Sequence, residues 1–253
     1  MMADFIRFPL FSTRPFWVCL LFLGSNPGLL HSIPSLDFPD SLRIEILLEQ
    51  LLTHPAQQNS TLQSLQKFEL HQFSNSNKNK IASYLFNDRI VSKKLVLFAG
   101  FLNMEKTLIA LSPKHQQDKS FLQHINLALV RAGDSEKTMI LHRNLQKISP
   151  NDDFVYEVLP LLRYTKQIII YDWLLNMILS DEKNCHPADA ETAGNINCAY
   201  RIIEALAPNI IDFPIEIDKW GDLKTDNYPK ALAVARDWIR ENQGDYKINN
   251  QTY

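Results

Sequence analysis

The sequence repeats itself between Leu95 and Leu179, and this repetition constrains the fold more than any other feature. Residues 95–107 align with residues 126–138, 31 positions later (126 minus 95), and both copies end in Glu-Lys-Thr. A third, weaker copy covers residues 156–168, 30 positions further on (156 minus 126). Such self-similarity at a short period is typical of stacked repeats, in which each unit buries its apolar face against its neighbours. The alternative is a non-repetitive helical bundle in which Glu-Lys-Thr recurs by chance.

The middle copy has the pattern of two antiparallel helices joined by a tight turn. Its apolar residues between Phe121 and Val130 have helical spacing, and Ser120 stands where an N-cap is expected. Gly133 can adopt the left-handed conformation that ends a helix, and Asp134 can accept N–H bonds at the start of the next helix. We therefore predict the repeat turn at Gly133 and Asp134.

The residues from Leu127 to Thr138 resemble the short bacterial HEAT-like repeat of the phycobilisome-lyase type, in which a Leu-Gly-Asp turn separates two helices. The other two copies have Leu102-Asn103 and Arg163-Tyr164 at the position of Gly-Asp. The whole chain also resembles a group of uncharacterised exported HEAT-repeat proteins. The resemblance implies an all-α fold, an α-α superhelix or HEAT-like solenoid of antiparallel helix pairs.

Residues 1–32 have the pattern of a secretory signal peptide. Arg7 and Arg14 precede an apolar run at 16–23, which is followed by the turn-rich stretch 24–28. The apolar run is too short to span a bilayer, and Ser25 and Ser32 are candidates for the last residue before cleavage. We therefore expect export to the periplasm, the envelope or the extracellular space, and no transmembrane span in the mature chain. A buried first helix or an uncleaved anchor is the alternative.

Behind this segment the sequence predicts one domain, residues 33–245. Helical spacing begins at Asp40, and residues 40–90 are expected to cap the stack as one or two atypical repeats. Residues 226–243 are predicted to form the closing helix. Residues 246–253 are predicted to be a frayed C-terminal tail.

Charge and motifs argue against several classes of function. The chain has 26 Lys and Arg against 28 Asp and Glu, a formal net charge of −2, and nucleic-acid binding would need far larger basic clusters. It contains no phosphate-binding loop, dinucleotide fingerprint, nucleophile elbow or zincin motif. No two of the seven histidines are three or four residues apart, the spacing that would place two metal ligands on one helix face. We therefore predict no catalytic residue, cofactor or metal site.

The segment 181–198 is the part of the chain richest in residues that could bind a metal or transfer a proton. These residues are Asp181, Glu182, Cys185, His186, Asp189, Glu191 and Cys198. In an exported protein, Cys185 and Cys198 are expected to form a disulfide, because Cys19 would leave with the signal peptide. Free thiols, or a metal site that uses Cys185, His186 and Cys198, are the alternatives.

These observations leave two hypotheses for the function. The first is a non-enzymatic exported α-solenoid that acts as a scaffold for an unidentified protein or peptide partner, because stacked helices offer an extended concave surface. The second is an enzyme, metal-assisted or lyase-like, that uses the 181–198 loop, by analogy with lyases that contain the short repeat. Aromatic residues along one face would favour the first hypothesis, and converging His and carboxylate side chains in a pocket the second.

Overall fold

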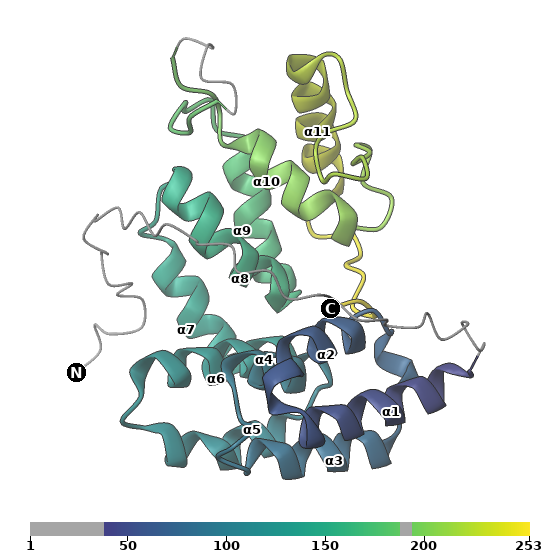
Figure 1. Ribbon diagram of the computed structural model, residues 1–253. Coiled ribbons are helices and arrows are strands. Elements are labelled where there is room, and N and C mark those ends of the chain that lie inside the picture. The colour runs from purple at the N-terminus through teal and green to yellow at the C-terminus, as the bar shows by residue number, and fades with distance from the viewer. Residues whose placement is uncertain (1–37, 188–193) are drawn as a thin grey trace, which may run out of the picture.

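The computed structural model describes residues 38–187 and 194–253, and this part of the chain is all-α (Figure 1). It contains eleven α-helices: α1 Asp40–Thr53, α2 Gln58–Leu65, α3 Asn75–Leu85, α4 Lys93–Phe101, α5 Glu105–Leu111, α6 Lys119–Ala132, α7 Ser135–Leu145, α8 Leu159–Thr165, α9 Ile168–Ile178, α10 Ala199–Leu206 and α11 Tyr228–Asn242. Within the same residues there are no strands but only isolated β-bridges, and no helix is long and apolar enough to cross a bilayer. The predicted signal peptide, residues 1–32, lies outside the described residues.

Short helical turns connect several of these helices. Four are 3-10 segments: η1 Pro55–Gln57, η2 Leu70–Gln72, η3 Ser112–His115 and η5 Ala207–Asn209. The fifth, η4 at Phe154–Val158, is a π-helical turn that leads directly into α8.

Helices that alternate along the chain contact one another. α2 contacts α4, α4 contacts α6, α6 contacts α8, and α8 contacts α10. Among the remaining helices, α1 contacts α3, α7 contacts α9, and α9 contacts α11. In Figure 1, α1 to α6 form the lower part of the molecule, and α7 to α11 form the upper part, where the helices stand more steeply.

Buried apolar side chains form two clusters that meet at α6. The first extends along the chain from Ile44 to Leu129 and also includes Tyr164, whereas the second extends from Val130 to Ile248. α6 contributes Leu129 to the first cluster and Val130 to the second, and α8 contributes Tyr164 to the first and Leu162 to the second, so both helices join the lower and upper parts.

Three turns between consecutive helices contain one residue with a positive φ. These residues are Asn103 after α4, Gly133 after α6 and Lys166 after α8, with φ angles of 57°, 99° and 52°. At the middle turn, the Asp134 side chain accepts a hydrogen bond of 2.9 Å from the backbone N–H of Lys137, at the start of α7. The geometry at Gly133 and Asp134 is the one predicted from the sequence.

Two local predictions about the repeats were wrong. The third turn is not at Arg163-Tyr164, which lie inside α8, but at Lys166. The turn residue lies three positions later (166 minus 163) than the ungapped alignment gives. The π-helical turn η4, which holds more residues per turn than an α-helix, accounts for part of this shift. The N-cap of α6 is Asp118 and not Ser120, because the Asp118 carboxylate accepts the backbone N–H of Phe121 at 2.9 Å.

The prediction of a frayed tail over residues 246–253 was also wrong. Tyr246 and Ile248 are buried, and the backbone N–H of Ile211 donates to the carbonyl of Lys247 at 2.9 Å. In an extended segment, residues two positions apart lie on the same side, and Tyr246 and Ile248 both reach the second apolar cluster. The C-terminal residues are therefore docked on the helices.

Candidate functional site

Residues 249–253 lie without helical structure against several helices, and the surface that they contact is the candidate functional site. We call this surface the tail-binding face, and it consists of Leu70, Phe98, Phe101, Arg131, Tyr164 and Asn209. These residues come from η2, α4, α6, α8 and η5, in that order. The face therefore combines residues of both the lower and the upper parts of the molecule (Figure 1).

Main-chain atoms of the docked residues make most of the polar contacts with this face, and the Tyr253 phenol adds a hydrogen bond with the Gln66 side chain. One nitrogen of Arg131, Nη2, donates to the carbonyl oxygens of Asn250 at 3.2 Å and Thr252 at 3.0 Å. The backbone N–H of Leu70 donates to the carbonyl oxygen of Gln251 at 2.9 Å. Because these contacts use backbone carbonyls, they place few demands on the sequence of the bound segment.

An aromatic side chain provides the side-chain contact of the docked residues. The ring of Tyr253 lies 6.4 Å from the ring of Phe98, 5.7 Å from that of Phe101 and 5.5 Å from that of Tyr164, measured between centroids. These are ordinary distances for favourable aromatic pairs. Burial at this position raises the pKa of the Tyr253 phenol to about 12.

Arg131 is a buried cation that has no carboxylate partner in the part of the chain that the structure describes. Only 6% of the residue is exposed, and its guanidinium lies 5.7 Å from the ring centre of Phe101 and 5.9 Å from that of Tyr164. Its Nη1 atom is buried and has no hydrogen-bond partner. Burial lowers the pKa of Arg131, although a guanidinium stays protonated in proteins. Buried charges are normally paired with an opposite charge. Arg131 instead has an unused donor, Nη1, and no negatively charged partner among the described residues.

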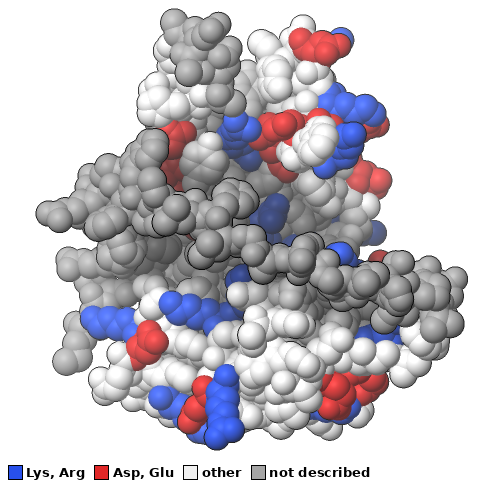
Figure 2. All heavy atoms as spheres, viewed as in Figure 1, with Lys and Arg blue, Asp and Glu red and all other residues white. Residues whose placement is uncertain are grey.

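Lys166 is a second buried cation beside this site. It is 4% exposed, and its ammonium donates a hydrogen bond to the side-chain oxygen of Asn209, which is a neutral acceptor. Burial, together with the positive charges of Arg131 and Arg163, lowers the pKa of Lys166 to about 7. Within residues 38–187 and 194–253 no acid pairs with it. Figure 2 shows that several of the atoms visible in the hollow between the two parts of the molecule belong to Lys or Arg.

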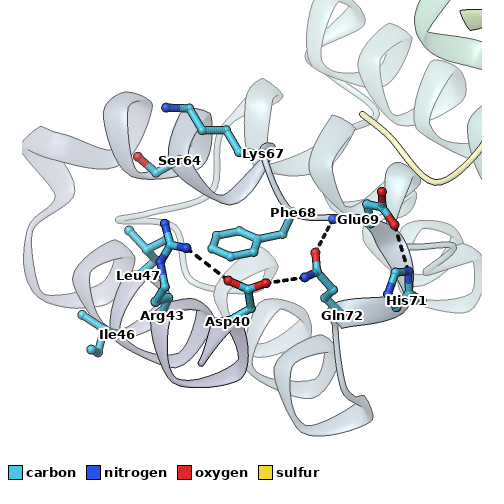
Figure 3. Close-up of a pocket in the computed structure, with 10 residues that line it drawn as sticks. All are labelled: Asp40, Arg43, Ile46, Leu47, Ser64, Lys67, Phe68, Glu69, His71 and Gln72. Atoms are coloured by element: carbon cyan, nitrogen blue, oxygen red, sulfur yellow. Dashed lines mark hydrogen bonds and ion pairs between the residues drawn. The ribbon is translucent and has the colours of Figure 1, made fainter. Parts of the chain in front are cut away.

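A surface pocket of about 750 Å³ between α1, α2 and η2 is a weaker candidate (Figure 3). Asp40 accepts from Arg43 at 3.1 Å and from the Gln72 side chain at 2.7 Å, and His71 lies 3.2 Å from Glu69. These side chains are largely exposed and satisfy one another, and surface ion pairs of this kind contribute little binding energy. Among the described residues, no side chain of this pocket has a buried polar atom without a hydrogen-bond partner, as Arg131 does.

The predicted cysteine pair lies at disulfide distance. The sulfur atoms of Cys185 and Cys198 are 2.10 Å apart, and their Cα atoms are 5.1 Å apart. The backbones of Cys185 and Ile196 also form an antiparallel bridge, which holds the two sides of the loop together.

The other residues of the 181–198 loop do not converge on one point. The imidazole of His186 contacts the Asp152 carboxylate, and this hydrogen bond lowers the pKa of Asp152. Asp181 pairs instead with Arg236, at 2.7 Å. Asp189 and Glu191 lie outside the described residues. Among the residues that are described, no three His, Cys, Asp or Glu side chains gather as a metal site would require.

The sequence patterns did not single out Arg131, Lys166 or Tyr253. The sequence does contain a sign that Arg131 is buried, because apolar residues precede it at 127–130 and Ala132 follows it. The signal for Lys166 was its place at the third repeat turn, which the alignment had assigned to Arg163-Tyr164. Tyr253 is out of phase with the alternation of Tyr246 and Ile248, and that alternation is too short to distinguish a docked segment from a loop.

Comparison with known proteins adds nothing to this geometry: no family model, no curated protein and no solved structure matches the chain.

Proposed function

We propose that this protein is an exported, non-enzymatic α-solenoid whose tail-binding face holds a non-helical segment of a partner protein. The successive contacts of α2, α4, α6, α8 and α10 support the solenoid, since repeated helix pairs place every second helix in one layer. The recurrence of a left-handed turn residue at Asn103, Gly133 and Lys166 supports the same arrangement. The cysteine pair at disulfide distance is what an oxidising compartment would favour.

The observation that carries the proposed function is the binding of residues 249–253 through their main chain. Arg131 and the backbone of Leu70 together contact three consecutive carbonyls, and three aromatic rings surround one tyrosine. A segment of another protein needs only accessible carbonyls and one aromatic side chain to make these contacts. The face is thus suited to polypeptides rather than to a small substrate.

The docked residues compete with any partner because they belong to the same chain. A short tether gives an effective concentration on the order of millimolar, so a partner must bind better than the tethered residues or wait for their release. Replacement of Tyr253 by alanine removes the aromatic anchor and should open the face while leaving the helices intact.

The test is fluorescence anisotropy with a labelled peptide of residues 244–253. We expect saturable binding to the full chain that carries Tyr253→Ala, and binding to the wild-type chain that is weaker by about ten-fold or more, because the tethered residues compete. The control is a scrambled peptide of the same composition. If the peptide does not bind the Tyr253→Ala chain, or if the scrambled peptide binds as well, the proposed function is wrong.

A further inference from the structure

We infer that the segment recognised by the tail-binding face is acidic, and that its carboxylate contacts the two buried cations Arg131 and Lys166. This inference rests on the proposed function and adds to it the chemical class of the partner. It follows from three observations: the uncompensated charge at the face, the backbone conformation of Lys166 and the composition of the docked residues.

The first observation is that the two buried cations at the face have only neutral hydrogen-bond acceptors. Arg131 uses Nη2 for two neutral carbonyls and leaves the buried Nη1 without an acceptor, and Lys166 has one neutral acceptor, the side chain of Asn209. The positive charge of Arg131 also repels that of the Lys166 ammonium, and this repulsion contributes to the lowered pKa of Lys166. A carboxylate offers two charged oxygens, so it would supply the acceptor that Nη1 lacks and would reduce the repulsion.

The second observation is that lysine occupies a position where glycine would be more favourable. Lys166 has a φ of 52°, a region that side chains other than Asn and Asp seldom adopt, and the equivalent turn of the middle copy has Gly133. Lysine at this position therefore combines backbone strain with the burial of an amine. A residue held in such a conformation points to a function for its side chain.

The third observation is that the docked residues carry no charged side chain. Residues 249–253 are Asn-Asn-Gln-Thr-Tyr, and the three amide residues have the same shape as Asp, Asp and Glu but lack the negative charge. Of the three, Asn249 is partly buried, whereas Asn250 and Gln251 are exposed. The chain's own segment matches the face in backbone and aromatic contacts and leaves its cations unpaired. It is thus an occupant without charged side chains, which a segment of a partner with acidic side chains can displace.

The experiment compares two labelled peptides on the full chain that carries Tyr253→Ala. The neutral peptide has the sequence of residues 244–253 with an amidated C-terminus, so that the charges of Asp245 and Lys247 cancel. The acidic peptide, also amidated, replaces its amide residues as Asn249→Asp, Asn250→Asp and Gln251→Glu. We expect the acidic peptide to bind about ten-fold tighter or more, as charge-assisted bonds to buried donors should allow. A scrambled acidic peptide measures any attraction that depends on net charge alone.

Variants of the protein then show whether Arg131 and Lys166 cause the preference for the acidic peptide. On the same background, we expect Arg131→Gln and Lys166→Gly each to reduce the acidic-over-neutral ratio to about two-fold or less, because each removes one of the two cations. The matched control is Arg143→Gln, which removes an exposed positive charge on α7 outside the face and should leave the ratio unchanged. Circular dichroism establishes that each variant is folded, and if Arg131→Gln is not, the Lys166→Gly result decides alone.

Each other outcome rejects the inference in a recognisable way. If the neutral and acidic peptides bind equally, the partner is not selected for charge, although the proposed function stands. If the preference survives both Arg131→Gln and Lys166→Gly, the acidic group binds elsewhere. If inorganic phosphate at the peptide concentration displaces the acidic peptide, the cations serve a free anion. If neither peptide binds the Tyr253→Ala chain, the proposed function is rejected together with the inference.

Discussion

Lys166 carries two separate energetic penalties in this fold. Its φ of 52° places a side-chain-bearing residue in the left-handed region, a strain of about 1 kcal/mol or more. Its amine is also buried beside Arg131, and burial favours the neutral form. Glycine at this position would remove both penalties.

We predict that Lys166→Gly raises the free energy of unfolding by about 1 kcal/mol or more, because it relieves the strain and removes the buried amine. Urea denaturation measures this change. The matched control is Asn103→Gly, which relieves a similar φ of 57° at an exposed position without removing an amine, and its gain should be smaller. A Lys166→Gly chain less stable than the wild type would contradict the account of this turn.

Lys166 should also make the stability of the wild-type chain depend on pH. Its pKa is about 7 in the folded chain against 10.5 for an unperturbed lysine, so the unfolded chain binds more protons between these values. The contribution of Lys166 to the free energy of unfolding therefore rises as the pH increases through 7 towards 10.5. The charged groups that face it, Arg131 and Arg163, stay protonated over this range.

The measurement is the stability difference between Lys166→Gly and the wild type from about pH 6 to about pH 9, because other titrating groups cancel in the difference. We expect the advantage of the variant to be largest at the acidic end and to shrink as the pH rises. A constant difference would mean that the Lys166 amine is solvated in the folded chain.

At the scale of elements, the packing of α4 on α6 depends on one glycine. A Cβ at Gly100 would lie 2.6 Å from the carbonyl oxygen of Ala128 and 2.7 Å from its Cα, and would also meet the hydroxyl of Tyr164. Because the first two atoms belong to the α6 backbone, the helices would have to move apart. Such a movement would also disturb the tail-binding face, to which both helices contribute.

We predict that Gly100→Ala lowers the free energy of unfolding by about 1–3 kcal/mol, the usual range for overpacking a core. Thermal unfolding followed by circular dichroism measures this loss. The comparison is Gly133→Val, where nothing lies within 4 Å of the added Cβ and the whole loss, about 1 kcal/mol or more, comes from the φ of 99°. An unchanged melting temperature for Gly100→Ala would mean that α4 and α6 are not in this close contact.

The sequence predicted the elements better than it predicted the site. Helical periodicity identified most of the helices, and Gly133-Asp134 located a turn, because these signals depend on neighbouring residues. The third turn was missed because Lys166 has none of the preferences of a turn residue, and its position is maintained by packing. The tail-binding face was missed because its residues are as far apart as Leu70 and Asn209, and only the tertiary structure brings them together.

At the scale of the whole molecule, the proposed export to an oxidising compartment predicts that Cys185 and Cys198 are joined in the native protein. A disulfide between Cys185 and Cys198, with a sequence separation of 13, should stabilise the chain by about 3 kcal/mol in the chain-entropy model. We expect that protein purified from its native compartment without reductant takes up no alkylating label at either cysteine, and that reduction first exposes both. Label on both cysteines without reductant would remove this support for export.

The docked C-terminal residues also link the lower and upper parts of the molecule. The backbone of Leu70, in the lower part, donates to Gln251, whereas Ile211, in the upper part, donates to Lys247. Residues 249–253 are held chiefly by Tyr253 and Arg131, but the preceding residues are held by the buried Tyr246 and Ile248. The two ends of this segment should therefore be released separately.

We predict that Tyr253→Ala releases residues 249–253 and leaves residues 246–248 in place. Hydrogen exchange reports both events, because the amide of Leu70 loses its acceptor when Gln251 departs, whereas the amide of Ile211 keeps the carbonyl of Lys247. We expect faster exchange at Leu70, by about ten-fold or more, and unchanged exchange at Ile211. Faster exchange at both amides would indicate that the whole segment is released as one unit, and no change at either would show that Tyr253 is not the anchor. Addition of the acidic peptide to the Tyr253→Ala chain should then slow exchange at Leu70 again, because a bound segment restores the carbonyl that this amide has lost.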